Sequence, residues 1–136
     1  MSRVTPKNQE YEYQGSVLIS QTDKEGIITY ANKKFCEVSG YTADELVGSP
    51  HNIIRHPSMP KKVFAKMWQT LLSGQVWNGL VKNLRKDGLY YWVESEILPI
   101  RDENQEVTGY ISVRKSTSPK NILEMEDIYN KMQEEV

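Results

Sequence analysis

Residues 76–100, VWNGLVKNLRKDGLYYWVESEILPI, decide the fold class of this chain. The apolar and aromatic residues on either side of Lys86-Asp87-Gly88 predict two strands, residues 76–85 and 89–100. The Lys-Asp-Gly tripeptide between them is a strong signal for a tight hairpin. A third strand, residues 107–114, follows the polar turn at 102–104. This half of the chain therefore predicts an antiparallel meander.

The segment just before the meander has helical rather than strand periodicity. Residues 60–73 place their apolar side chains on one broad stripe, and Gly74 ends the helix. The residues of the stripe are Val63, Phe64, Met67, Trp68, Leu71 and Leu72. Pro60 suits the first position of this helix, because proline lacks the N–H that would be unpaired there.

The first half of the chain predicts two more strands, residues 16–20 and 27–30, with two short helices after them. Asn32 can cap the first of these helices, and Thr42 with Glu45 forms a capping box for the second. The order of elements predicts an α+β domain with one five-stranded antiparallel sheet and short helices packed on one face.

Both ends of the chain differ from the central domain of residues 15–116. Residues 1–14 are polar, carry only Tyr11 and Tyr13 as large anchors, and predict a loosely attached arm. Residues 117–136 predict an acidic helix whose apolar side chains have heptad spacing. These side chains are Ile122, Met125, Tyr129, Met132 and Val136. So short a helix must dock on the domain, pair with another chain or continue in a longer protein.

Composition excludes several classes of protein. The chain has 136 residues and a formal net charge of −1, which fits one domain and argues against a dedicated nucleic-acid binder. Its lone cysteine, Cys36, allows no internal disulfide. No apolar run is long enough for direct membrane insertion, and the first residues do not resemble a signal peptide. We therefore expect a cytoplasmic protein.

The most informative stretch for function is residues 52–60, NIIRHPSMP. It holds an adjacent cation and imidazole, Arg55 and His56, between two apolar residues and two prolines. Arginine supplies a planar fork of donors and histidine a tunable one, so the pair suits an anionic or hydrogen-bonding ligand. The structural alternative is that His56 simply caps the turn before Pro57.

The motifs along the chain resemble those of PAS domains, over residues 15–116. The general cues are the segments at 26–32, 39–42, 45–48, 86–88 and 99–100. More specifically, the chain resembles the flavin-binding PAS domains of Aer-type bacterial aerotaxis receptors. That resemblance is carried by the segments at 50–57, 59–60, 67–68, 81–83, 86–88 and 91–93 and by Phe64, Gly74, Trp77 and Gly79.

The resemblance implies FAD held without a covalent bond, with its redox state passed to a membrane-bound, chemotaxis-type transducer in cis or in trans. It assigns these residues to the flavin pocket: Phe35, Ile54, Arg55, His56, Ser58, Met67, Trp77, Asn83 and Tyr91. At Ser58 many relatives have an acidic residue instead, so a contact that requires a carboxylate is not available here.

Catalysis is poorly supported, because the sequence contains no catalytic triad spacing, phosphate-binding glycine loop or zinc-ligand pattern. We expect no enzyme activity and no metal site. Two other classes of function remain open beside a flavin sensor. One is a PAS module that senses haem, through His51 or His56, or another small molecule. The other is a ligand-free interaction module that forms a homodimer.

Overall fold

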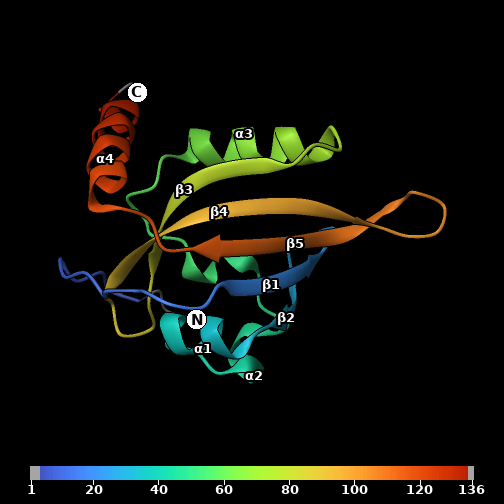
Figure 1. The fold of residues 1–136 in the computed structure, drawn as a ribbon, viewed down its shortest axis with the longest axis horizontal. Helices are drawn as coiled ribbons and strands as arrows, with labels where there is room; N and C mark the ends of the chain where they lie inside the picture. Colours follow the sequence, from blue (N-terminus) through green and yellow to red (C-terminus); the bar gives the residue numbers. More distant parts are fainter. Residues whose placement is uncertain (1–3, 135–136) are drawn as a thin grey trace.

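The computed structural model describes residues 4–134 and contains one five-stranded antiparallel sheet. Its strands are β1 (Leu18–Asp23), β2 (Ile28–Ala31), β3 (Trp77–Leu84), β4 (Tyr90–Arg101) and β5 (Val107–Lys115). They lie in the order β2-β1-β5-β4-β3, so the first and last parts of the chain meet at the centre of the sheet (Figure 1). The predicted fold class is confirmed.

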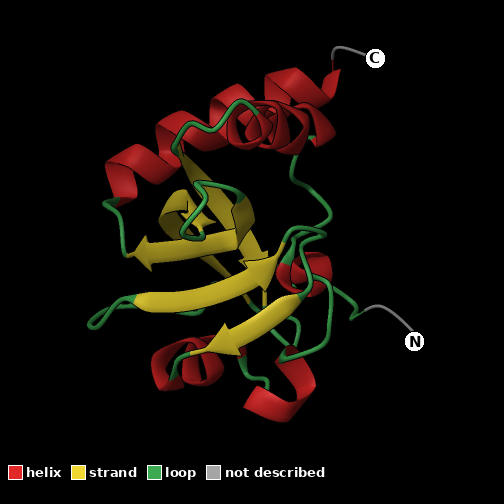
Figure 2. Cartoon of the chain, turned by 90° about the vertical axis from the view of Figure 1, so that its right-hand side faces the viewer, coloured by secondary structure: helices red, strands yellow, loops and turns green. Residues whose placement is uncertain are grey.

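The helices flank this sheet. They are α1 (Lys33–Ser39), α2 (Ala43–Leu46), the 3₁₀ turn η1 (His51–Ile54), α3 (Lys61–Leu72) and α4 (Pro119–Glu134). Figure 2 shows the strands as a layer between helices. In Figure 1, α4 stands beside β3, at the end of the sheet away from the β4–β5 hairpin. None of the helices within residues 4–134 has both the length and the apolar character needed to cross a membrane.

Local signals in the sequence set most of the element ends. The Asn32 side chain accepts from the N–H of Phe35, and Thr42 and Glu45 form the predicted capping box. Helix α3 begins after Pro60 and ends at Leu72, two residues before Gly74, which has a φ of 83°. The predicted strand at 16–20 is shifted, because β1 runs on to Asp23, whose carboxylate accepts from the N–H groups of Glu25 and Ile27.

The N-terminal segment is held more closely than its polar composition predicts. Lys7 N–H donates to the carbonyl of Gly88, and Tyr11 N–H donates to that of Tyr90. Tyr13 is buried, and its hydroxyl donates to the carbonyl of Ser16. The Lys7 and Tyr11 attachments use backbone groups, which residue types do not reveal. The first three residues of the predicted arm lie outside the described residues.

The two faces of the sheet have different roles because side chains alternate along each strand. On β4, Tyr91 and Val93 are fully buried toward the helices α1 and α3, whereas Trp92 lies on the opposite face. There Trp92 stacks on Tyr129 of α4, with ring centroids 6.2 Å apart. The Tyr129 hydroxyl also donates to the carbonyl of Leu80, at 2.6 Å. The C-terminal helix therefore docks on the domain, the first of the three predicted outcomes; Val136 lies outside the described residues.

Candidate functional site

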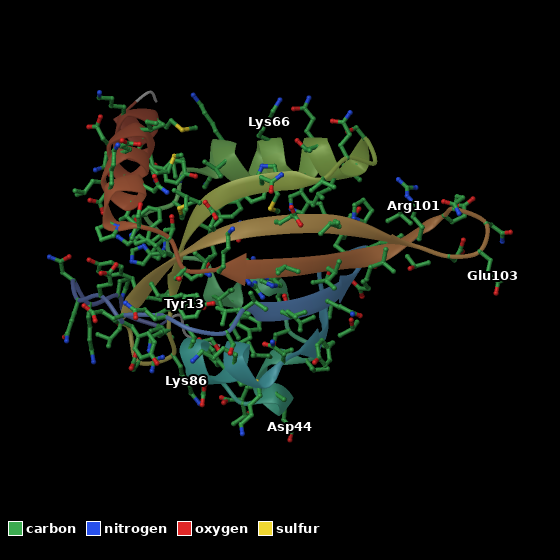
Figure 3. All side chains as sticks on the ribbon, viewed as in Figure 1. Tyr13, Asp44, Lys66, Lys86, Arg101 and Glu103 are labelled. Carbon is green, nitrogen blue, oxygen red and sulfur yellow. The ribbon has the colours of Figure 1, made fainter. Side chains whose placement is uncertain are left out.

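A cavity of about 290 Å³ lies between the sheet and the segment formed by η1 and α3. Its apolar wall comes from the inward faces of η1, α3 and β3. The residues of this wall are Ile54, Phe64, Met67, Trp68, Leu71, Trp77 and Val81. The predicted stripe of α3 is confirmed as an inward face except at Leu72, which is 77% exposed beside the end of the helix. The α3 lysines are also exposed, and Figure 3 shows Lys66 projecting outward.

The opposite wall is polar and centres on a buried arginine. Arg114 of β5 is 2% exposed and lines the cavity with His51 of η1. Both contact Ser20 of β1, which is fully buried and is not itself on the cavity wall. One Nη of Arg114 lies 2.8 Å from Ser20 Oγ, and the other lies 3.1 Å from His51 Nε2. Ser20 Oγ is also 2.9 Å from that same Nε2. Three side chains from distant parts of the chain therefore form one hydrogen-bonded cluster.

The charges of the cluster fix which groups donate. Arginine only donates, so Nε2 of His51 must accept from Arg114, and the imidazole is neutral with its proton on Nδ1. Burial and the nearby Arg114 charge lower the pKa of His51 to about 3. Burial also lowers the pKa of Arg114 to about 10. No carboxylate forms a salt bridge with Arg114 within the described residues.

Arg114 has donor capacity left over. Its Nε–H is buried and has no hydrogen-bond partner among residues 4–134. The guanidinium lies 4.3 Å from the ring centroid of Phe35. This contact with the ring does not replace a hydrogen-bond acceptor for the Nε–H. A buried cation without a counter-charge and with an unused donor costs free energy in an empty protein. Such a group indicates a site built for an electron-rich or anionic ligand.

The loop that carries Arg55 is fixed to the edge of the sheet. Arg55 pairs with Asn83 of β3 as an isolated antiparallel bridge, and His56 N–H donates to the carbonyl of Lys82 at 3.4 Å. The Arg55 guanidinium lies 3.6 Å from the ring centroid of Phe64 on α3. This pairing brings Arg55 and Asn83, which are far apart in sequence, to neighbouring positions on the cavity wall.

His56 and Ser58 lie beside the cavity rather than on its wall. The Nδ1 of His56 accepts from the N–H of Ser58 at 3.0 Å, so its imidazole closes the turn. Burial and the charge of Lys82 lower the pKa of His56 to about 4. Ser58 is exposed, and its carbonyl accepts from the side chain of Gln133 in α4.

Five of the nine residues assigned to the pocket line this cavity, namely Ile54, Arg55, Met67, Trp77 and Asn83. Of the others, Phe35 and Tyr91 are fully buried but support the polar wall from behind. Phe35 stacks on His51, with centroids 5.9 Å apart. Tyr91 is the cross-strand neighbour of Asn83, and burial raises its pKa to about 12.

Sequence reasoning missed the polar cluster. Ser20 and Arg114 were not assigned to a pocket, and His51 was considered only as a haem ligand. One signal was available: Tyr110, Ser112 and Arg114 alternate along β5, so the arginine falls on the same face as the core. A charged residue on the inward face of a strand is rare and indicates function. No group of three or more potential metal ligands is clustered in the described part of the chain.

Comparisons with known proteins agree with this architecture. The model of the PAS fold matches residues 28–114. The chain is 46% identical to the aerotaxis receptor of Escherichia coli over 114 residues, and 35% identical to the nitrogen fixation regulatory protein of Klebsiella pneumoniae over 111 residues. These matches cover 84% and 82% of this chain, but the chain spans only 22% of the length of each relative.

Solved structures give the same result. The PAS domain of a Colwellia psychrerythraea protein is 27% identical, with a TM-score of 0.69, over 74% of this chain and 86% of that one. A light-oxygen-voltage domain studied with a flavin analogue is 27% identical, with a TM-score of 0.70, over 84% and 87% of the two chains. The matching family model describes a fold rather than a catalytic family. The predicted resemblance is therefore confirmed, and the chain belongs to the PAS fold family.

Proposed function

We propose that this chain is a flavin-binding PAS module that senses redox state and passes it to a signalling partner. The observation that carries the proposal is the two-sided cavity, in which an apolar wall faces the cluster of Ser20, His51 and Arg114. A flavin matches both walls, because its ring is flat and mostly apolar while the edges of the ring carry polar atoms. The similarity to the aerotaxis receptor supports the same conclusion.

The residues present fit a flavin ring. When bound, flavin supplies reversible electron transfer, and its ring becomes more electron-rich on reduction. The unpartnered Nε–H of Arg114 can donate to a ring carbonyl or ring nitrogen, and the positive charge favours the reduced ring. Asn83, on the opposite wall, can reorient its amide between donating and accepting, because the amide carries both kinds of group.

FAD is the flavin that we propose. The cavity of about 290 Å³ is at the small end of ligand pockets, which span about 300–1,000 Å³, so it suits the ring system rather than a whole dinucleotide. The phosphates would then extend past Arg55, whose guanidinium can donate to them in pairs. Lys61 and Lys62 are exposed at the start of α3, just after this loop, and add positive charge.

The absorption spectrum of the purified protein tests this assignment. We expect the paired near-ultraviolet and blue bands of a flavin, either as purified or after incubation with FAD and gel filtration. Acid release followed by chromatography against FAD and FMN standards identifies the flavin. A colourless protein after incubation with excess FAD would contradict the proposal, and an intense Soret band would indicate haem instead. Haem ligation through His51 is disfavoured because its Nε2 already accepts from Arg114, and His56 does not line the cavity.

For the output we propose the docking of α4, acting on a chemotaxis-type transducer that is membrane-bound and lies in the same chain or in another. Two polar contacts attach α4 to the part of the domain around the cavity. Tyr129 donates to the carbonyl of Leu80 on β3, and Gln133 donates to the carbonyl of Ser58 in the Arg55 loop. A change in the ring's charge that moves β3 or this loop would change how firmly α4 is held. A second copy of the chain is the alternative partner for a released α4.

Asn83→Ser is expected to separate flavin binding from this output. The serine keeps a hydroxyl at the cavity wall but cannot switch between amide donor and acceptor, so flavin should remain bound. Hydrogen exchange over residues 119–134 should then be equal in the oxidised and dithionite-reduced variant, whereas the wild type should differ between the two states. Asn104→Ser, in the exposed turn between β4 and β5 and away from both the cavity and α4, is the matched control. Equal protection in both states of the wild type would contradict this output route.

A further inference from the structure

Gly79 lies under the indole of Trp77 on the cavity side of β3. A β-carbon at position 79 would sit 2.5 Å from both Cζ2 and Cη2 of Trp77, far inside van der Waals contact. Residues 77 and 79 share a face because side chains alternate, so the indole leans along its own strand onto the next inward position. The benzene part of the indole therefore occupies the space that any other residue at 79 would fill.

This arrangement sets the shape of the cavity. Trp77 is 8% exposed and lines the cavity, whereas Gly79 is not on the cavity wall. The indole thus separates Gly79 from the cavity. Its neighbours on the same face, Val81 and Ile97, also line the cavity. An indole pushed off Gly79 by a side chain has the cavity itself as the adjoining space.

The strand gains nothing else from a glycine here. Glycine in the interior of a strand weakens it, and often marks a place where another group approaches the backbone closely. Gly79 has no left-handed φ that would require glycine, unlike Gly74 at 83° or Gly88 at 93°. The close approach of the Trp77 ring is the structural reason for a glycine at this position.

We propose that Gly79 is a positioning residue that seats Trp77 against the sheet and so sets the width of the cavity for a flat, fused-ring ligand. The proposal deepens the proposed function, because the ligand it concerns is the flavin ring. It makes two separate claims. One concerns the packing of the ligand-free protein. The other concerns the part of the ligand whose binding depends on Gly79, which is the fused ring.

The first experiment tests the packing claim without any ligand. We expect Gly79→Ala to lower the Tm of the ligand-free protein, although alanine is normally better than glycine in a strand. In a Trp77→Leu background, where no indole reaches position 79, the same Gly79→Ala change should leave the Tm unchanged or raise it. Trp77→Phe is the second background, in case the leucine variant does not fold. An equal Tm change in all backgrounds would overturn the proposal, whether or not the protein binds flavin.

The second experiment tests the claim about the ligand, with FAD, FMN and riboflavin as probes. Because all three share the ring, we expect Gly79→Ala to weaken each of them by a similar factor, about tenfold to a hundredfold. Arg55→Ala, our matched comparison, should weaken FAD and spare riboflavin, which has no phosphate. Unchanged riboflavin binding by Gly79→Ala would overturn the ligand claim. Failure of the wild type to bind any of the three would count against the proposed function itself, while the Tm comparison would still decide the packing claim.

Discussion

Arg114→Met is expected to lower flavin retention sharply while leaving the ligand-free protein at least as stable as the wild type. The guanidinium is the only cation of the Ser20, His51 and Arg114 cluster, and it has a buried donor with no partner in the described residues. A charge-assisted bond from this donor to the ligand is worth about 1.5–3 kcal/mol, so losing it would weaken binding by roughly tenfold to a hundredfold.

The expected effect on stability has the opposite sign. A buried cation that no carboxylate neutralises loses hydration on folding without full compensation, at a cost of several kcal/mol (order of magnitude). Methionine fills a similar volume with apolar atoms, and Ser20 can still bond to His51 across their 2.9 Å contact. The variant should therefore bind flavin less well but unfold less easily. Such a trade-off between activity and stability is common at functional sites.

Two measurements check this expectation. Flavin retained per protein after dialysis reports binding, and the urea midpoint of the ligand-free protein reports stability. Arg114→Lys, which keeps a charge but loses the planar fork, should bind more weakly than the wild type but better than the methionine variant. Wild-type flavin stoichiometry in Arg114→Met would show that this cluster does not face the ligand. A large fall in the ligand-free midpoint would show that Arg114 stabilises the fold instead.

The sequence predicted the elements of this fold well because their signals are local. The capping residues Asn32 and Thr42, the hairpin turn at Lys86 and the apolar stripe of α3 each act within a few positions. The order of the strands depends on contacts between distant segments. β1 pairs with β5, with Leu18 opposite Arg114, and no local pattern contains that register. The sequence therefore predicted one five-stranded antiparallel sheet but not the order of its strands.

The same division explains what was missed at the site. Arg55 and Trp77 stand in recognisable motifs, and both line the cavity. The cluster of Ser20, His51 and Arg114 joins β1, η1 and β5, and no two of its members are close in sequence. Only the sheet register, which sets Ser20 opposite Ser112 and Leu18 opposite Arg114, shows that they converge.

The two histidines are expected to make the ligand-free protein sensitive to mild acid. Burial lowers the pKa of His51 to about 3 and that of His56 to about 4, while both titrate near 6.5 in the unfolded chain. Because the pKa values are lower in the folded protein, each histidine is more stable there in its neutral form, and protonation favours the unfolded chain. The stabilising effect of the neutral form is complete above about pH 6.5, because there neither state binds a proton at these sites.

Below about pH 6.5 the unfolded chain takes up protons that the folded protein refuses, so stability falls as the pH falls. Each histidine contributes a slope of up to about 1.4 kcal/mol per pH unit, until the pH approaches its folded pKa. From about pH 7.5 to 4.5 the pair should cost roughly 3–5 kcal/mol, a large part of a typical domain's stability. Carboxylates with lowered pKa values, such as Glu45 and Asp87, lose their stabilising effect mainly at lower pH.

Urea unfolding at a series of pH values, with matched variants, assigns this slope to individual residues. His51→Gln keeps an acceptor near Nε2 for Arg114, and His56→Asn keeps one near Nδ1 for the N–H of Ser58. Neither replacement titrates in this range, so each variant should remove about half of the slope, and the double variant nearly all of it. A wild-type slope that persists in the double variant would mean that other groups bind the protons. A slope lost entirely with His56→Asn would mean that His51 is protonated in the folded protein, so its Nε2 could not accept from Arg114.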